Sequence, residues 1–273
     1  MSATTDPGTP DGLHADEPDG VGGPSAADVP PRRRGGGRAF VKELVLVVVG
    51  ALVLSSLLRA FVGEMFVIPS ASMQNTLLEG DRVLVEKITD VRRGQVVVFQ
   101  DPGGWLPDPA DPGLVDRLLG FVGIPSAASP GYLIKRLVGL PGDTVVCCDD
   151  RGRVTVNGAA LDEGAYLYTG PTGAQVAPSA VRFRVVVPRD HVFVMGDHRD
   201  DSLDSRCHLS DASPQGRGQG AFVPESDVVG PAVAIVSPLD RARRLRVPAT
   251  YAVVPAPGPA PATGVITPAG VSC

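Results

Sequence analysis

Histidine and cysteine are scarce in this sequence, which contains four of each among its 273 residues. Two of the cysteines, Cys147 and Cys148, are adjacent, and no second Cys or His pair stands at the spacing of a zinc site, so we expect no metal centre. An excess of positive charge is also missing. The formal net charge is −5, whereas a nucleic-acid-binding protein usually carries a basic face, and no nucleic-acid partner is expected.

Large apolar side chains are almost absent from residues 1–39, which are rich in Pro, Gly and Asp. Such a segment cannot bury enough surface to offset the entropy lost on ordering, so we predict that it is disordered. The whole tail, residues 1–43, ends in a basic cluster made of Arg32, Arg33, Arg34, Arg38 and Lys42.

The opposite composition follows in residues 44–63, which read LVLVVVGALVLSSLLRAFVG. A helix of this length spans about 30 Å, the thickness of the hydrocarbon core of a bilayer, and we predict one transmembrane helix. A cleaved signal peptide would have a shorter apolar core nearer the N-terminus, and a buried helix of a soluble protein is the other alternative. Because the basic cluster precedes this run, residues 1–43 are expected in the cytoplasm and everything after Gly63 outside.

Short β-branched runs separated by Gly, Pro or Asp follow residue 63, as is typical of strands. We predict a mainly β domain over residues 64–248, with insertions near residues 101–131 and 208–220. Residues 249–273 contain five prolines and no charge, and we predict a flexible tail. The predicted strands cover residues 83–88, 95–100, 153–158, 181–187 and 191–195.

Two cations, Lys135 and Arg136, interrupt an apolar run. If the run is a strand, its side chains alternate between two faces, so the two cations point in opposite directions. A lysine amine held in an apolar pocket has a lowered pKa and can act as a general base, whereas arginine stays protonated. Lys135 is therefore the candidate base, with a solvated edge-strand lysine as the alternative.

A serine nucleophile needs such a base, and Ser-Lys pairs are a recognised arrangement. Ser70 and Ser72 follow Pro69, where a turn or cap role is the alternative for each. A Ser-His-Asp site is the rival hypothesis, but the sequence has no Gly-x-Ser-x-Gly elbow. The charged segment of residues 195–206 is either a solvated loop or a scaffold beside the lysine.

Three segments resemble, in order, the conserved boxes of bacterial type I signal peptidases. Ser70-Ala71-Ser72-Met73 resembles the P-S-x-S-M nucleophile box, KRLVGLPGD at residues 135–143 matches the lysine box, and GDHRDDSLDSR at residues 196–206 matches the last box. The resemblance covers roughly residues 66–230. It implies an extracytoplasmic, antiparallel, β-barrel-like catalytic domain behind one transmembrane helix.

The same resemblance implies a serine endopeptidase in which Ser72 is the nucleophile and Lys135 the general base. Ser70 and the backbone N–H of Ser72 are expected to bind the oxyanion, and Ser202 to orient the Lys135 amine. Asp204, paired with Arg136 or Arg206, is expected to hold the scaffold. The full scaffold set is Arg136, Asp197, Asp204 and Arg206, and the expected pocket residues are Phe66, Ile68, Leu77, Leu133 and Ile134.

The implied substrates are secretory preproteins that emerge from the translocon and are cleaved after A-x-A-like sites. The implied location is the plasma membrane, so the lipid bilayer is a further partner, and no organic cofactor is implied. Two other hypotheses are a self-cleaving Ser/Lys repressor, which would need an N-terminal DNA-binding domain, and a non-catalytic membrane-anchored scaffold.

Cysteine pairing stays open at the level of sequence. Cys147, Cys148 and Cys207 fall in the expected outer domain, where disulfides can form. Cys273 ends the predicted tail, and a bond between Cys207 and one of the adjacent pair is one candidate.

Overall fold

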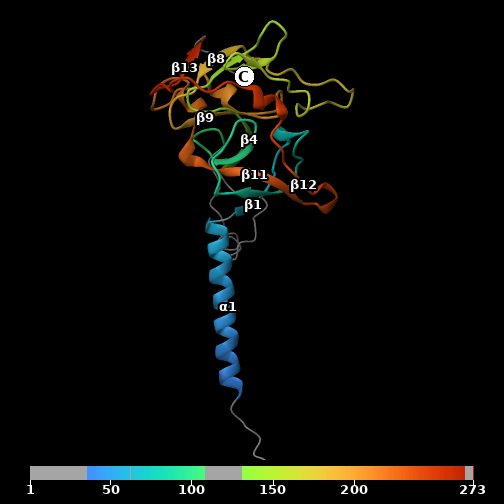
Figure 1. Ribbon diagram of the computed structural model, residues 1–273, viewed down its shortest axis with the longest axis vertical. Helices are drawn as coiled ribbons and strands as arrows, with labels where there is room; N and C mark the ends of the chain where they lie inside the picture. The colour runs from blue at the N-terminus through green and yellow to red at the C-terminus, as the bar shows by residue number, and fades with distance from the viewer. Residues whose placement is uncertain (1–35, 62, 108–130, 268–272) are drawn as a thin grey trace, which may run out of the picture. The chain divides into compact units, whose positions relative to one another are not determined.

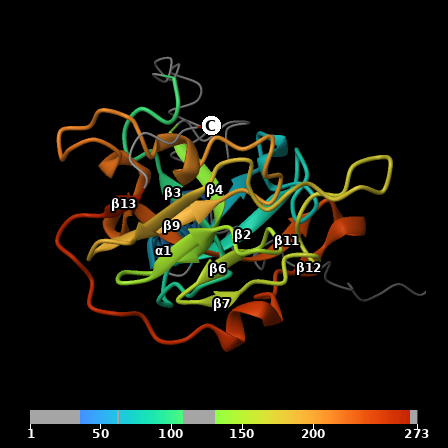
Figure 2. The ribbon, with the colours of Figure 1, turned by 90° about the horizontal axis from the view of Figure 1, so that it is seen from above.

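The computed structural model describes residues 36–61, 63–107, 131–267 and 273, and within this part of the chain every strand pairing is antiparallel. The strands form two sheets (Figures 1 and 2). The prediction of a mainly β, antiparallel domain is therefore confirmed. The disorder predicted for residues 1–39 falls outside the described residues up to residue 35, and it is wrong for residues 36–39, which are helical. Most of the insertion near 101–131 also lies outside the described residues.

The first sheet has the strand order β1-β2-β11-β3-β4-β9-β10, with β12 paired to β11. It curls because β11 joins its two halves: Val228, Gly230 and Pro231 pair with β3, and the following residues pair with β2. The strand bounds are β1 Gly63–Val67, β2 Arg82–Glu86, β3 Val96–Gln100, β4 Tyr132–Gly139, β9 His191–Met195, β10 Val223–Pro224, β11 Val228–Ser237 and β12 Arg243–Arg244.

The strand β11 was not predicted from the sequence because Gly230 and Pro231 interrupt its apolar pattern. Both residues belong to the bend between its two halves. Gly230 has φ 152°, and a Cβ there would lie 1.8 Å from the carbonyl oxygen of Glu86. Only glycine allows β11 to approach β2 so closely at this point.

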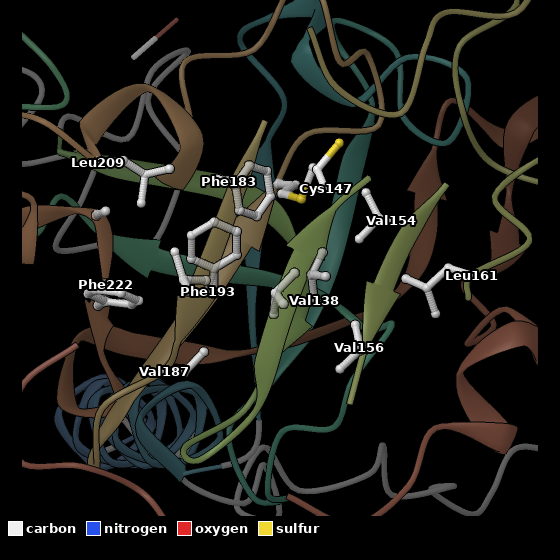
Figure 3. Packing of buried hydrophobic residues seen from close by; sticks show 14 of the residues in the cluster. Val138, Cys147, Val154, Val156, Leu161, Phe183, Val187, Phe193, Leu209 and Phe222 are labelled. Carbon is white, nitrogen blue, oxygen red and sulfur yellow. The ribbon is translucent and has the colours of Figure 1, made fainter. Parts of the chain in front are cut away.

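The second sheet has the order β13-β8-β5-β6-β7. Its strands are β5 Thr144–Cys147, β6 Val154–Val156, β7 Ala159–Ala160, β8 Phe183–Val186 and β13 Val265–Thr267. Apolar side chains from this sheet pack against those of β4 and β9 to form one core, as Val138, Phe183 and Phe193 show in Figure 3. Alternation along β8, with Phe183 and Val185 buried and Arg184 exposed, follows the polar and apolar pattern of its sequence.

The helix α1 covers Gly36–Phe61. Within the residues that the structure describes, no helix meets the combined length and hydropathy needed to cross a membrane.

Residues 249–267 are ordered, so the prediction of a flexible tail is wrong for this part of 249–273. The strand β13 pairs with β8, and Tyr251 is only 5 % exposed. The Tyr251 ring packs where Gly94 leaves room, because a Cβ on Gly94 would lie 2.5 Å from the ring. The buried Tyr251 ring and the pairing of β13 with β8 hold this proline-rich segment against the rest of the domain.

The cysteine pairing differs from the candidate considered above. The structure pairs Cys207 with Cys273 and Cys147 with Cys148. Two hydrogen bonds exchanged by Gln219 and Gly264 hold the C-terminal segment against residues 208–220. This contact brings the end of the chain back to Cys207, with 4.5 Å between the two Cα atoms.

We predict that Tyr251→Ala lowers the free energy of unfolding by about 3 kcal/mol, since it removes a buried aromatic ring. Denaturant unfolding of the full chain in detergent provides the measurement. Val253→Ala is the matched control, because Val253 lies in the same segment and is 71 % exposed. Equal, small effects of the two substitutions would show that the C-terminal segment does not stabilise the domain.

Candidate active site

Ser72 and Lys135 meet although 63 residues separate them in the sequence. The Lys135 Nζ donates a hydrogen bond of 2.5 Å to the Ser72 Oγ. Lys135 is 4 % exposed and Ser72 is 6 % exposed. Ser72 lies in a short 3-10 helix, η1, that covers Ala71–Met73, and the Ser70 hydroxyl lies 3.3 Å from the Ser72 hydroxyl. A nucleophile, an amine and a second hydroxyl are therefore in hydrogen-bonding contact.

The environment of Lys135 favours the neutral amine. Burial lowers its pKa to about 8, although the negative charges of Asp204 and Asp197 act in the opposite direction and the positive charge of Arg206 adds to the lowering. Near neutral pH a larger fraction of such an amine is neutral, and so able to accept a proton, than of an ordinary lysine. Lys135 therefore has the buried environment that a lysine needs to act as a general base.

Arg136 points to the other face of β4, as alternation along a strand requires. Its guanidinium forms two hydrogen bonds with the carboxylate of Asp197, of 2.7 and 2.5 Å, and a third of 2.6 Å to the Gly94 carbonyl. Burial alone would lower the pKa of Arg136, but the Asp197 charge raises it above its ordinary value, so this cation is permanent. The hydroxyl of Thr76 donates to the same carboxylate at 2.5 Å. Asp197 thereby ties the segment after Ser72 to the strand that carries Lys135.

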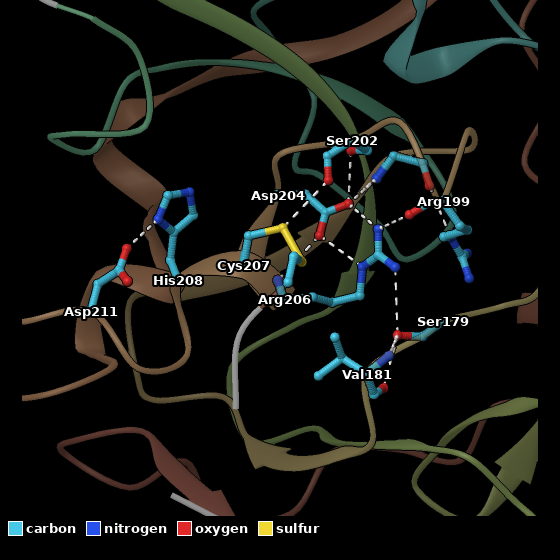
Figure 4. Close-up of a disulfide and its surroundings, with 11 residues drawn as sticks. Ser179, Val181, Arg199, Ser202, Asp204, Arg206, Cys207, His208 and Asp211 are labelled. Atoms are coloured by element: carbon cyan, nitrogen blue, oxygen red, sulfur yellow. Dashed lines mark hydrogen bonds and ion pairs between the residues drawn. A yellow bond between two sulfur atoms is a disulfide. The ribbon is translucent and has the colours of Figure 1, made fainter. Parts of the chain in front are cut away.

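Asp204 pairs with Arg206 and not with Arg136, which settles the alternative left open by the sequence. The two hydrogen bonds from the guanidinium measure 2.9 and 2.8 Å, and Gly196 N–H donates a third at 2.8 Å (Figure 4). Burial alone would raise the pKa of Asp204, but the Arg206 charge and these hydrogen bonds lower it. Asp204 therefore stays ionised beside the lysine.

The role expected for Ser202 needs a correction. Its hydroxyl donates to Asp204 at 2.8 Å, and among the described residues no hydrogen bond joins it to the Lys135 amine. Ser202 still lies beside the catalytic segment: a Cβ on Gly196 would come within 2.2 Å of the Ser202 Oγ and 2.6 Å of the Ser72 carbonyl oxygen. In this structure Ser202 orients Asp204, whose charge acts on the amine.

A buried ion pair was missed by the sequence reasoning. Arg199 contacts the Glu163 carboxylate, both side chains being almost fully buried, and donates at 2.9 Å to the Gly196 carbonyl. Arg199 thereby holds the carbonyl of Gly196, whose N–H is held by Asp204. Arg199 belongs to the last conserved box, but Glu163 lies outside all three boxes, and no sequence motif indicated it.

The histidines do not provide a rival base. The backbone N–H of His198 donates to the Ser72 carbonyl at 3.1 Å, and its ring Nδ1 lies 3.3 Å from the Ala71 carbonyl oxygen. Across the described parts of the chain, the Ser72 hydroxyl has hydrogen-bonding contacts to Lys135 and Ser70 only. The geometry therefore favours Ser-Lys over Ser-His-Asp.

A cavity of about 130 Å³ opens beside the Ser72–Lys135 pair. Phe66, Ile68, Leu133 and Ile134 line it, as expected for pocket residues. Leu77 does not: it is fully buried in the core beneath β1 and β2. Pro69, the proline of the nucleophile box, also lines it, and the lining that the motifs did not indicate comes from Val67, Val98, Leu106 and Tyr132.

Comparison with known proteins shows the family of this chain. The family model described as "Signal peptidase, peptidase S26" matches residues 41–237, more than half of the chain. The chain belongs to this family. Signal peptidase I of Mycobacterium tuberculosis strain H37Rv is 32 % identical over 226 residues, covering 75 % of each chain. The probable signal peptidase I-1 of Synechocystis is 34 % identical over 206 residues, covering 74 % of this chain and 85 % of that one.

Membership in the signal peptidase family makes this chain a peptidase. A solved signal peptidase I from Enterococcus faecalis is also similar, at 22 % identity and a TM-score of 0.29, and matches 53 % of this chain and 97 % of that one. Every residue of the Ser72–Lys135 site lies inside the matched range.

We predict that peptidase activity rises with pH through about pH 8, because the Lys135 amine must lose its proton to act as a base. Lys135→Arg should lower kcat/KM by about 10²–10⁴-fold, the usual contribution of a general base, since a guanidinium keeps its charge. The measurement is kcat/KM against pH. His191→Ala is the control for titration by a histidine, and loss of the pH step in that variant would contradict the assignment.

Proposed function

We propose that this chain is a membrane-bound serine endopeptidase that removes signal peptides from secretory preproteins at A-x-A-like sites. Family membership supports the reaction class. One observation carries the mechanism: the amine of Lys135 contacts the hydroxyl of Ser72 in a buried site, with its pKa lowered to about 8 by burial. Translocating preproteins, the translocon and the lipid bilayer are the proposed partners.

In the acylation step, the neutral Lys135 amine takes the proton of Ser72 as the Oγ attacks the carbonyl carbon of the scissile peptide bond. The negative charge that develops on the carbonyl oxygen is bound by the Ser70 hydroxyl and the backbone N–H of Ser72. When the peptide bond breaks, the Lys135 ammonium gives its proton to the departing amine, the new N-terminus of the mature protein. The signal peptide is left as an ester on Ser72.

In the deacylation step, Lys135 accepts a proton from a water molecule that attacks the ester carbonyl. The ester bond breaks and the proton returns to Ser72. The signal peptide leaves as a carboxylic acid, which releases its proton to water and becomes a carboxylate. The acids near the amine do not compete for this proton because Asp204 is paired with Arg206 and Asp197 with Arg136.

The lining of the cavity supports selection of apolar side chains. Its volume of about 130 Å³ lies between walls made mainly of apolar residues, beside the Ser72–Lys135 pair. The strand β1, which contributes Phe66 and Val67 to the wall, is a terminal strand of the first sheet. An extended substrate segment can pair with this edge by β-augmentation.

We predict that Ser72→Ala abolishes cleavage of a purified preprotein with an Ala-x-Ala site. Ser70→Ala should leave measurable activity, lowered on the order of 10²–10³-fold, the usual effect of losing one oxyanion donor. Product masses from the full-length protein in detergent give both the rate and the cleaved bond. Ser226→Ala, at an exposed serine in a different 3-10 helix, is the control.

Full activity in Ser72→Ala would overturn the mechanism. Absence of cleavage in the wild-type chain, across preproteins with different Ala-x-Ala sites, would favour the non-catalytic scaffold.

Membrane anchoring through α1 rests on its side chains. Every described side chain of this helix, from Phe40 to Ser55, is exposed, and from Leu44 onward all the large ones are apolar. Such a helix needs an apolar environment around its whole circumference. We therefore propose that the apolar run of residues 44–63 is held in the plasma membrane, with the basic cluster on the cytoplasmic side.

We predict that protease added outside spheroplasts digests the domain after Gly63 and leaves the N-terminal tail intact. An epitope tag at each end, followed by immunoblotting, provides the measurement. Substituting the five basic residues before the run with Gln should weaken this orientation, because they are the signal that retains the tail inside. Protection of the C-terminal tag in the wild-type chain would contradict the topology.

A further inference from the structure

The substrate cavity is lined in part by residues outside the conserved boxes. One of them is Leu106, which is half-buried. It lies in the loop of residues 101–107 that follows β3. No motif, and no part of the Ser-Lys mechanism, accounts for a leucine here.

This loop has a defined conformation. The carboxylate of Asp101 accepts hydrogen bonds from the backbone N–H groups of Gly103 and Trp105 at 3.1 and 3.2 Å, and from that of Leu106 at 3.1 Å. These hydrogen bonds to Asp101 fix the backbone of Leu106. The contacts of the neighbouring residue, Trp105, also restrict its position.

Trp105 is held by the segment of residues 208–220. Its ring stacks on His208, with 4.4 Å between centroids and 11° between planes, and its Nε1 donates to the Gly220 carbonyl at 3.0 Å. On its other side the ring meets the edge of Phe99, a β3 residue, at 5.7 Å. Trp105 is 3 % exposed, so this packing leaves little freedom to the loop.

His208 is in turn fixed in place. Its Nδ1 lies 2.7 Å from the Asp211 carboxylate, and it follows Cys207, which is bonded to Cys273 (Figure 4). Its Nε2 is buried and has no hydrogen-bond partner among the described residues. His208 is therefore connected to the cavity through Trp105, on which its ring is stacked.

From these contacts we propose that Leu106 is a specificity-determining residue, and that His208 is a positioning residue that sets, through Trp105, how far Leu106 reaches into the substrate cavity. The insertion of residues 208–220 then has a role in choosing substrates. This inference rests on the proposed function, because it names which residues restrict the size of the side chain that the cavity accepts.

The test uses the full chain in detergent and two series of preproteins, which place Gly, Ala or Val at one or the other of the two selected small positions. Leu106→Ala should lower the preference for Ala over Val, measured as a ratio of kcat/KM, at least about tenfold in one series, because discrimination between side chains in an apolar pocket follows its size. The other series serves as an internal control. Leu106→Phe, which fills the cavity, should shift the preference from Ala toward Gly in the same series.

His208→Ala should change the same ratio in the same direction as Leu106→Ala, and His208→Phe should restore the wild-type ratio because it keeps a flat ring beneath Trp105. Leu245→Ala is the matched control: Leu245 is also half-buried, lies outside this cavity, and should leave both ratios unchanged. A general loss of stability would lower the rates without changing the ratio.

Unchanged ratios in both Leu106 variants, with wild-type cleavage that depends on Ser72, would overturn the role of Leu106 and leave the proposed function standing. A shift in the Leu106 variants without one in His208→Ala would overturn the positioning role of His208. Cleavage by the wild-type chain that Ser72→Ala does not reduce would instead count against the proposed function itself.

Discussion

The chemistry of this site depends on a lysine amine that is buried beside a serine hydroxyl. Burial lowers the pKa of Lys135, but Asp204 and Asp197 lie close enough to favour its charged form. Each of these acids is paired with an arginine, Asp204 with Arg206 and Asp197 with Arg136. Arg206 therefore does more than hold a loop, since its charge acts together with burial to lower the pKa of Lys135 against the acids that raise it.

This requirement explains why so many charges are buried in one small region. An unpaired buried carboxylate is costly, whereas two-point pairing with a guanidinium satisfies both groups and fixes their orientation. The Asp197 pair connects β4 to the segment after Ser72 through Thr76. The Asp204 pair connects the turn after β9 to the Cys207 region, and removal of one partner from either pair would leave a buried charge uncompensated.

The alternation of side chains along β4 separates two functions in adjacent residues. Lys135 faces the substrate cavity, and Arg136 faces the scaffold, where its guanidinium also lies 4.2 Å from the centre of the Tyr166 ring. A neutral base and a permanent cation can stand next to each other in sequence because the strand places them in different environments. A shift of the strand register by one residue would exchange the two environments.

The sequence by itself determined the fold class, the strand His191–Met195 to the residue, and the chemical roles open to Ser72, Lys135 and Arg136, because these follow from local patterns of apolar residues and from side-chain chemistry. Only the tertiary structure decided that Asp204 pairs with Arg206, that Ser202 serves Asp204, that Leu77 belongs to the core, and that Leu106 borders the cavity. It also decided the order of residues 249–267 and the Cys207–Cys273 bond. These features depend on contacts between segments far apart in the chain, and local composition carries no information about which distant partner a side chain or a backbone strand will meet.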